Sequence, residues 1–356
     1  MAATLVEIAR LARVSVATVS RALNGQPGVG PKMRKRIQAL AAQVDYTPHA
    51  NARALVTGRI PFLGLVVPDI TNPFFPSLAR GAEEEAFARG YSLLLLNTNW
   101  SPTRLRQAFD LLTSRRVAGL MMSVSLEGLG DDHRDWSDLA RTVVMAGVPA
   151  PVGSGIGAVD VDDLEGGRLV GRHLLERGWR RIGFVAGSAA DRSARDRLAG
   201  LQEALAEAGR PGALGATSAG EWSEASGYDQ ARRLLARRSR PDAIFAANDL
   251  LALGVARAAA EAGMALGTDL GLVGYDDIDS VRWTAVPITS VSQPEFDVGR
   301  EAARRLVALA EGAVAEPDAR LEPCLVVRAS SGANPHARPA TADGALAFQT
   351  STETVR

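Results

Sequence analysis

The chain has 356 residues, 46% of them hydrophobic, and its 40 basic and 40 acidic residues give a formal net charge of zero. This length predicts two or three domains, and no apolar run approaches the roughly 20 residues of a membrane-spanning helix. The N-terminus lacks the basic-then-apolar pattern of a secretory signal, and the lone Cys324 provides no disulfide framework. We therefore expect a cytoplasmic protein in which Cys324 is a small core residue.

Three amphipathic helix patterns occupy the first 44 residues. The first begins at Thr4-x-x-Glu7, a spacing typical of a capping box. Ser15 is placed to cap a second helix over 16–23, and a third is predicted over about 31–44. Two helices joined by a tight turn are typical of a helix-turn-helix, although a plain helical bundle would show the same pattern.

Charge separates the first 60 residues from the rest of the chain. They contain nine arginines and lysines against two carboxylates, a net charge of +7, which leaves −7 for the remainder. A basic head on an acidic body favours binding to nucleic-acid phosphates over a plain bundle.

Residues 47–59 connect the head to the body. Pro48 can begin a short helix and Gly58 can end it. Two turns of helix are marginal alone in water, so a plain linker is the alternative.

From Phe62 onward, short apolar strands alternate with amphipathic helices. Strands are predicted at 62–67, 91–97, 118–124, 142–147, 181–187, 213–219, 243–247, 270–276 and 288–292. Helices are predicted at 76–89, 103–115, 164–177, 195–208, 224–237, 250–262 and 295–311. This alternation predicts parallel sheets in doubly wound α/β units, too many for one sheet, so we expect two similar subdomains with a ligand cleft.

Ligands of such sheets bind beyond the carboxyl ends of the strands. The segments at those positions are Pro68–Phe75, Asn97–Trp100, Asp191–Arg197, Glu221–Ser223, Ala247–Asp249, Tyr275–Asp277 and Ser292–Pro294. Their carboxylates, amides and arginine beside aromatic faces suit a neutral polyhydroxylated ligand. We expect Asp249 to cap the helix that follows it, and Asp277 to hold its own loop.

The run VSVATVSRALNG (Val14–Gly25), followed by YTPHANARAL (Tyr46–Leu55), resembles the lactose-repressor (LacI/GalR) family of bacterial transcription regulators, to about residue 334. The resemblance implies an all-α helix-turn-helix head, a hinge helix and an α/β body of two doubly wound parallel-sheet subdomains of the periplasmic-binding-protein type. The expected divisions are a head at 1–46, a hinge at 47–59, a first subdomain at about 60–158 plus 289–320, and a second at about 159–288 plus 321–334. The composition of residues 335–356 predicts a disordered tail.

The resemblance implies DNA contacts at ten positions: Thr4, Val16, Ala17, Thr18, Ser20, Arg21, Asn24, His49, Ala52 and Leu55. The guanidinium fork of Arg21 also matches guanine O6 and N7 chemically, whereas Val16 and Ala17 can offer only apolar contact. Leu55 would wedge between base pairs from a hinge helix that folds on DNA. His49 stands where the family usually has Asn, so its contact is open.

The resemblance further implies an effector site formed by Phe75 or Phe74, Asp162, Arg197, Trp222, Asn248, Asp276 and Gln293. In it Arg197 grips the effector, and Asn248 with Asp276 binds hydroxyls. Gap placement leaves open whether Asp160, Val161 or Asp162 occupies the family's polar position.

We therefore expect a homodimeric repressor that binds a near-palindromic operator in double-stranded DNA and is released by a small sugar. A nucleoside, purine or other effector or corepressor is the alternative. A solute-binding protein of a transport system is a less favoured alternative, because the chain has a basic head and its sequence shows no signal segment. We expect no catalytic residue, cofactor or metal, since the four histidines share no strand end and neither a Ser nucleophile elbow nor a Gly-rich phosphate loop is evident.

Overall fold

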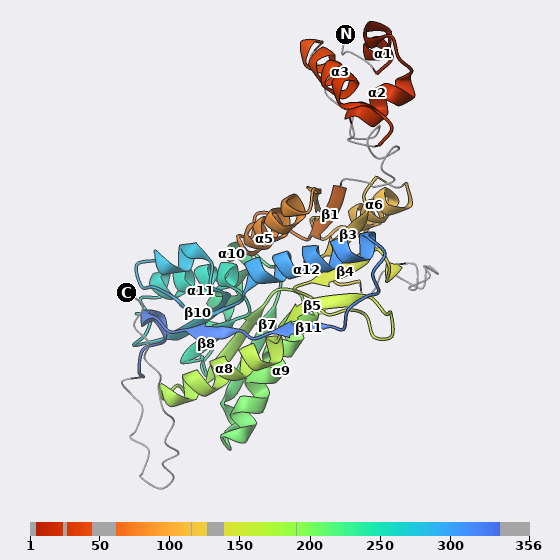
Figure 1. Ribbon diagram of the computed structural model, residues 1–356. Coiled ribbons are helices and arrows are strands. Elements are labelled where there is room, and N and C mark those ends of the chain that lie inside the picture. Colours follow the sequence, from red (N-terminus) through yellow and green to blue (C-terminus); the bar gives the residue numbers. More distant parts are fainter. Residues whose placement is uncertain are drawn as a thin grey trace, which may run out of the picture. The chain divides into compact units, whose positions relative to one another are not determined.

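The computed structural model describes residues 5–23, 27–44, 62–114, 116–126, 139–189 and 191–334 (Figure 1). The chain divides into two compact units: residues 1–70, 77–159 and 296–318 form the first, and residues 71–76, 160–295 and 319–356 form the second. No helix within the described ranges combines the length and apolar character needed to cross a lipid bilayer.

The head consists of three helices around a small apolar core. They are α1 (Leu5–Ala12), α2 (Val16–Leu23) and α3 (Pro31–Gln43), drawn in shades of red in Figure 1. All three helices contribute fully buried residues to this core, namely Ile8, Val19, Ala22 and Ile37. The three helices coincide with those that the sequence predicts.

A tight turn joins α1 to α2. Arg13 adopts a left-handed backbone (φ 57°), and the Val14 N–H donates to the Ala9 carbonyl at 3.0 Å, which closes the end of α1. The Ser15 hydroxyl accepts a hydrogen bond from the Thr18 N–H at 3.1 Å. Ser15 therefore caps α2, as predicted.

The first sheet has six strands in the order β11-β5-β4-β3-β1-β2. These strands are β1 (Phe62–Val67), β2 (Ser92–Asn97), β3 (Gly119–Met122), β4 (Val143–Ala146), β5 (Gly157–Val161) and β11 (Ala319–Leu321). The helices α5 (Phe74–Ala88), α6 (Pro102–Thr113) and α12 (Glu295–Ala310) alternate with them or follow them. The β1–β2, β1–β3, β3–β4 and β4–β5 pairs are parallel, as predicted, and β2 lies at one edge of the sheet.

The second sheet also has six strands, in the order β12-β10-β9-β8-β6-β7. These strands are β6 (Ile182–Ala186), β7 (Leu214–Ala219), β8 (Ala243–Ala246), β9 (Gly271–Asp276), β10 (Thr289–Ser292) and β12 (Cys324–Val326). The accompanying α-helices are α8 (Asp163–Glu176), α9 (Arg192–Glu207), α10 (Glu224–Leu235) and α11 (Asp249–Glu261). Three single-turn helices complete it: η1 (Pro211–Ala213), η2 (Asp279–Arg282) and η3 (Ala329–Ser331).

The edge strand β12 corrects two expectations. It pairs antiparallel with β10, so the second sheet is not wholly parallel. Cys324 begins this strand and is exposed rather than part of the core, because a strand at a sheet edge has no neighbour on one side.

Strand β10 corrects a third expectation, on where the chain leaves the second sheet. Residues 289–320 were assigned to the first subdomain. However, Thr289 to Ser292 pair in parallel register with Val273 to Asp276 of β9. The backbone hydrogen bonds of β10 thus continue the second sheet through Ser292, and the chain leaves it only afterwards.

Reciprocal glycines let three pairs of helices approach backbone to backbone. They are Gly167 with Gly200 (α8 and α9), Gly227 with Gly254 (α10 and α11), and Gly81 with Gly299 (α5 and α12). For example, a Cβ atom on Gly227 would lie 2.3 Å from the Leu251 carbonyl oxygen, and one on Gly254 would lie 2.1 Å from that of Glu224. Because neither partner leaves room for a side chain, these crossings fix how each helix lies against its neighbour.

Candidate functional site

The outward side of α2 carries the residues predicted to meet DNA bases. Val19 and Ala22 are fully buried against the other two helices. Val16, 41% exposed, and the exposed Ala17 and Arg21 lie on the opposite side. One helix therefore presents an arginine fork and two small apolar groups to the solvent.

The other predicted DNA contacts are less exposed or fall outside the described residues. Thr18 and Ser20 are half-buried, and the Thr18 hydroxyl lies 2.9 Å from the Ser15 hydroxyl in the cap of α2. The Arg34 guanidinium donates to the Ala22 carbonyl at 3.3 Å, which ties α3 to the end of α2. The predicted contacts that lie outside the described residues are Thr4, Asn24, His49, Ala52 and Leu55.

At the carboxyl ends of the second sheet, Arg197 is the centre of a buried cluster. Its side chain lies in the second turn of α9, where the Asp191 carboxylate caps the helix through the Ser193 N–H. Nε of Arg197 donates to Asp163 Oδ1 at 2.8 Å, and Nη1 donates to the carbonyl of Ala247, directly after β8. The guanidinium carbon stands 3.6 Å from the centroid of the Tyr275 ring.

Asp276, the last residue of β9, lies beside this cluster. Its Oδ1 accepts a hydrogen bond from Gln293 Nε2 at 2.7 Å, so two predicted effector contacts meet directly. Burial raises the pKa of Asp276 to about 7, although the nearby charge of Arg197 lowers it. The next residue, Asp277, accepts from Arg328 at 2.6 Å and from Arg282 at 3.1 Å. It holds its own loop, as predicted.

Asn248, not Asp249, caps α11. Asn248 Oδ1 accepts a hydrogen bond from the Leu251 N–H at 3.0 Å. The expectation that Asp249 caps this helix is wrong, because Asp249 is already its first helical residue. Asp249 is fully buried and accepts from the Ser290 hydroxyl at 2.8 Å and from the Ile278 N–H at 2.9 Å.

The predicted aromatic contacts belong to two places. Trp222 packs on Gly187, just after β6, where a Cβ atom would lie 2.2 Å from the indole. Its Nε1 is buried and has no hydrogen-bond partner among the described residues, so it can donate to an incoming acceptor. Phe74 and Phe75 lie at the start of α5 and contact each other edge to face, with ring centroids 5.1 Å apart.

The acidic residues between the end of β5 and the start of α8 differ in their contacts. Asp162 caps α8 through the Glu165 N–H at 2.9 Å and lies 3.7 Å from Arg320. Asp160 is buried, and its burial raises its pKa to about 7. Asp163 contacts Arg197, yet it was not among the predicted site residues, and Tyr275 was named only as part of the strand-end segment Tyr275–Asp277. The sequence does show several carboxylates close together at 160–163, and an arginine predicted to bind the effector is a plausible partner for one of them.

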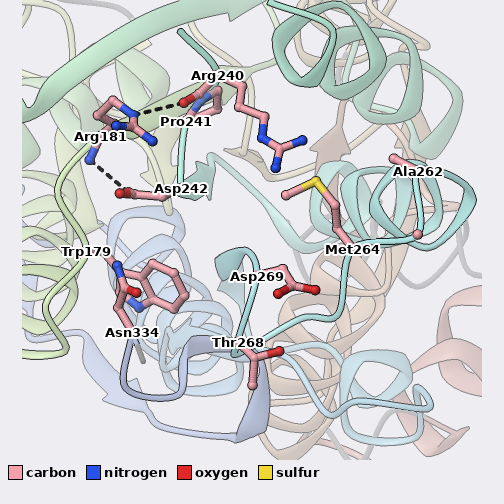
Figure 2. Close-up of a pocket in the computed structure, with 11 residues that line it drawn as sticks. Trp179, Arg181, Arg240, Pro241, Asp242, Ala262, Met264, Thr268, Asp269 and Asn334 are labelled. Carbon is pink, nitrogen blue, oxygen red and sulfur yellow. Dashed lines mark hydrogen bonds between the residues drawn. The ribbon is translucent and has the colours of Figure 1, made fainter. Parts of the chain in front are cut away.

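A cavity of about 340 Å³ lies elsewhere in the second compact unit (Figure 2). Its lining comes from segments that precede strands β6, β8 and β9, including Trp179, Arg181, Asp242 and Asp269. Arg181 donates through its backbone N–H to Asp242 at 2.8 Å and through Nε to the Arg240 carbonyl at 3.0 Å. None of the predicted effector residues lines this cavity, which is at the amino ends of the strands.

The helical head and the two sheets with their polar strand ends define a class of protein, a DNA-binding domain joined to a ligand-binding α/β body. Residues 4–49 match the family described as bacterial regulatory proteins, lacI family, and residues 172–331 match the periplasmic binding protein-like domain. The ribose operon repressor of Escherichia coli (strain K12) is 31% identical over 336 residues, which cover 92% of this chain and 100% of that protein. The chain therefore belongs to the lacI family of bacterial regulatory proteins. It is a DNA-binding repressor and not an enzyme.

Two solved structures support the same assignment. The lac repressor dimer bound to operator and the anti-inducer ONPF has a TM-score of 0.81 and 26% sequence identity, covering 94% of this chain and 100% of that one. A LacI family transcriptional regulator from Enterococcus faecium with bound ribose has a TM-score of 0.67 and 29% identity, covering 76% of this chain and 99% of that one.

Proposed function

We propose that this repressor is released from its operator by a small, neutral carbohydrate. The observation that carries the proposal is the buried cluster of Arg197, Asp276 and Gln293 at the strand ends. Around it, Asn248 and the free indole N–H of Trp222 add polar groups beside an aromatic face. Such a set suits a ligand with several hydroxyl groups, each of which both donates and accepts hydrogen bonds. A relative named for ribose and a related structure with bound ribose support the same class.

The head binds DNA through α2 in the major groove. The exposed Arg21 can reach guanine O6 and N7, while Val16 and Ala17 make apolar contacts, for example with a thymine methyl. The hinge contacts, with Leu55 as the minor-groove wedge, complete the interface. The net charge of +7 in the first 60 residues provides the phosphate attraction that brings the head to the duplex.

The chain acts as a homodimer on a near-palindromic operator in the cytoplasm. Edge strand β2 supports this, since Leu94 is 37% exposed and Leu95 is 44% exposed. Phe87, at the end of the preceding helix, is 75% exposed. A second copy of the chain that covers this edge removes apolar surface from water and brings two heads to two half-sites.

The effector controls DNA binding by altering the spacing of the two heads, and hence the folding of the hinge at 47–59. Such coupling between two sites typically amounts to about 1–3 kcal/mol, which changes operator affinity roughly 5- to 150-fold. The effector needs only this difference in affinity between the two states of the dimer.

A thermal-shift screen of the full chain tests the effector class. The panel contains ribose, other neutral sugars, nucleosides and free purines, because a ligand at 100 times its Kd stabilises the folded state by about 2.7 kcal/mol. A sugar should stabilise the wild type but not Arg197→Ala. Arg195→Ala, an exposed arginine on the same helix, is the matched control.

The same sugar should release the wild-type protein from a duplex selected by that protein from random sequence. Stabilisation by a nucleoside or purine alone would replace the carbohydrate with the alternative effector class. A sugar that binds Arg197→Ala as well as it binds the wild type would contradict the site itself.

A further inference from the structure

We infer that Asp163 makes the effector site select uncharged ligands, because it occupies the guanidinium of Arg197 and so excludes sugar phosphates and sugar acids. The inference rests on the proposed function, since it concerns the ligand of the same site. It assigns a specificity-determining role to a residue that does not need to touch the effector.

The geometry leaves Arg197 without the fork that its Nε would form together with a neighbouring Nη nitrogen, because Asp163 accepts from Nε. Arginine recognises carboxylate and phosphate best through a fork made by two neighbouring nitrogens. In Arg197 the Nε donor is taken by Asp163 and the Nη1 nitrogen already donates to the Ala247 carbonyl. The Tyr275 ring covers one face of the guanidinium. Nη2 has no hydrogen-bond partner within the described residues, so a neutral hydroxyl group can accept from it.

The ion pair between Arg197 and Asp163 is also shielded from solvent. The side chains of Arg197 and Asp163 are each 8% exposed, so water screens their attraction little. A ligand phosphate that used Nε of Arg197 would displace the Asp163 carboxylate, which would then be a buried charge without a partner. Leaving one member of a buried pair unpartnered is strongly destabilising.

Other buried carboxyl groups in the same unit also disfavour an anionic ligand beside Arg197. Among the described residues of the second compact unit, Arg197 is the only buried arginine. Four further carboxylates of the same unit are buried, namely Asp160, Asp249, Asp276 and Asp277. Of these four, Asp276 acts on the charge of Arg197 together with Asp163, so an anionic ligand group that enters beside Arg197 meets two carboxyl groups, whereas a hydroxyl can donate to them.

The test compares matched neutral and anionic probes by calorimetry and thermal shift on the full chain. The probes are ribose, ribose 5-phosphate, glucose, glucuronate and inorganic phosphate. The wild type should bind none of the anions measurably at concentrations where a neutral sugar saturates. In Asp163→Asn, which keeps the shape but removes the charge, affinity for inorganic phosphate and ribose 5-phosphate should rise by about tenfold or more, since the guanidinium can then form a charge-assisted hydrogen bond with the anion.

Three further variants make the result specific. Asp163→Asn combined with Arg197→Met should lose the gained phosphate affinity, because the freed positive charge is gone. Glu165→Gln removes a carboxylate from the same helix that pairs with Arg168 and Arg172 and not with Arg197, and should gain nothing. Asp163→Ser is the second variant if Asp163→Asn does not fold, because serine is well tolerated at a helix start.

The proposal is overturned if the wild type binds ribose 5-phosphate or glucuronate at least as tightly as the neutral partner. It is also overturned if the folded Asp163 variants gain no anion affinity. A failure of every sugar to bind would count against the carbohydrate effector, but the comparison with inorganic phosphate would still decide the role of Asp163.

Discussion

Gly167 on α8 and Gly200 on α9 face each other so closely that neither can carry a side chain. A Cβ atom on Gly167 would lie 2.1 Å from the carbonyl oxygen of Arg197, and one on Gly200 would lie 1.9 Å from that of Leu164. Asp163 and Arg197 lie about one turn before these two glycines. The crossing point of the two helices therefore sets the distance across the buried ion pair.

Gly200→Ala should push α8 and α9 apart and weaken both stability and effector binding. Overpacking of this kind typically costs about 1–3 kcal/mol, and the shift would lengthen the contact between Asp163 and Arg197. Urea unfolding and calorimetry with the bound sugar measure the two effects. Gly212→Ala is the control, because no atom lies within 4 Å of a Cβ built there. Equal stability of the two variants would show that the glycine contact does not position the pair.

Arg21→Ala should lower affinity for the selected operator by about 1–3 kcal/mol and relax the preference for one G·C pair. Lys35→Ala, an exposed base on α3, should instead weaken binding similarly on all sequences and reduce its salt dependence. Fluorescence anisotropy on operator and single-pair variants, at several salt concentrations, distinguishes the two. If Arg21→Ala weakened all duplexes equally, Arg21 would be a phosphate contact.

Leu95→Glu should convert the proposed dimer into monomers at micromolar concentration, because it places a charge on the apolar edge formed by β2. Operator affinity should fall with it, since a monomer holds one half-site only. Val314→Glu introduces the same charge at a position that is 87% exposed, and should leave the dimer intact. Analytical ultracentrifugation gives the oligomeric state, and an unchanged dimer in Leu95→Glu would place the interface elsewhere.

His173 should make stability fall in mildly acidic solution. It is buried, its Nε2 lies 2.7 Å from the Ser331 hydroxyl, and burial, with a further contribution from Arg177, lowers its pKa from 6.5 to about 4. The unfolded chain therefore takes up a proton first. The contribution of His173 to the free energy of unfolding is complete above about pH 6.5 and is lost as the pH falls towards 4.

The measurement is the free energy of unfolding in urea for the wild type and His173→Gln at pH 7.5 and pH 5. The wild type's advantage over the variant should shrink on acidification by at most about 2 kcal/mol, the value that the pKa shift gives between these two pH values before solvent screening is allowed for. The comparison with the variant is needed because Asp160 and Asp276 have pKa values raised to about 7. Their protonation makes the folded state more stable as the pH falls, which opposes the effect of His173. An advantage that is the same at both pH values would contradict the role of His173.

Local sequence patterns predicted most helices and strands correctly. They did not predict the elements and contacts that depend on residues distant in the sequence. Long helices and apolar strands were predicted to within a few residues, because their periodicity is local. Strand β5 was missed because Asp160 interrupts its apolar run, and β11 and β12 because three residues are too short for a pattern.

The site shows the same limit. Arg197, Asp276 and Gln293 were predicted from their positions at strand ends and from the family resemblance, and the structure brings them into one cluster. The contact of Asp163 with Arg197 joins residues 34 positions apart and depends on how α8 and α9 cross, which no local pattern reveals. The exchange of roles between Asn248 and Asp249 arose from a shift of one residue in where α11 begins.

The backbone after β9 carries a conflict between two demands on one residue. Asp276 and Asp277 have φ values of 105° and 56°, a left-handed pair without a glycine, and such conformations cost about 1–3 kcal/mol each. Glycine at 276 would relieve this strain, and it would also delete the carboxylate that Gln293 orients. Selection for thermal stability alone would thus drive position 276 towards a repressor that folds better and lacks the carboxylate that we propose for effector binding.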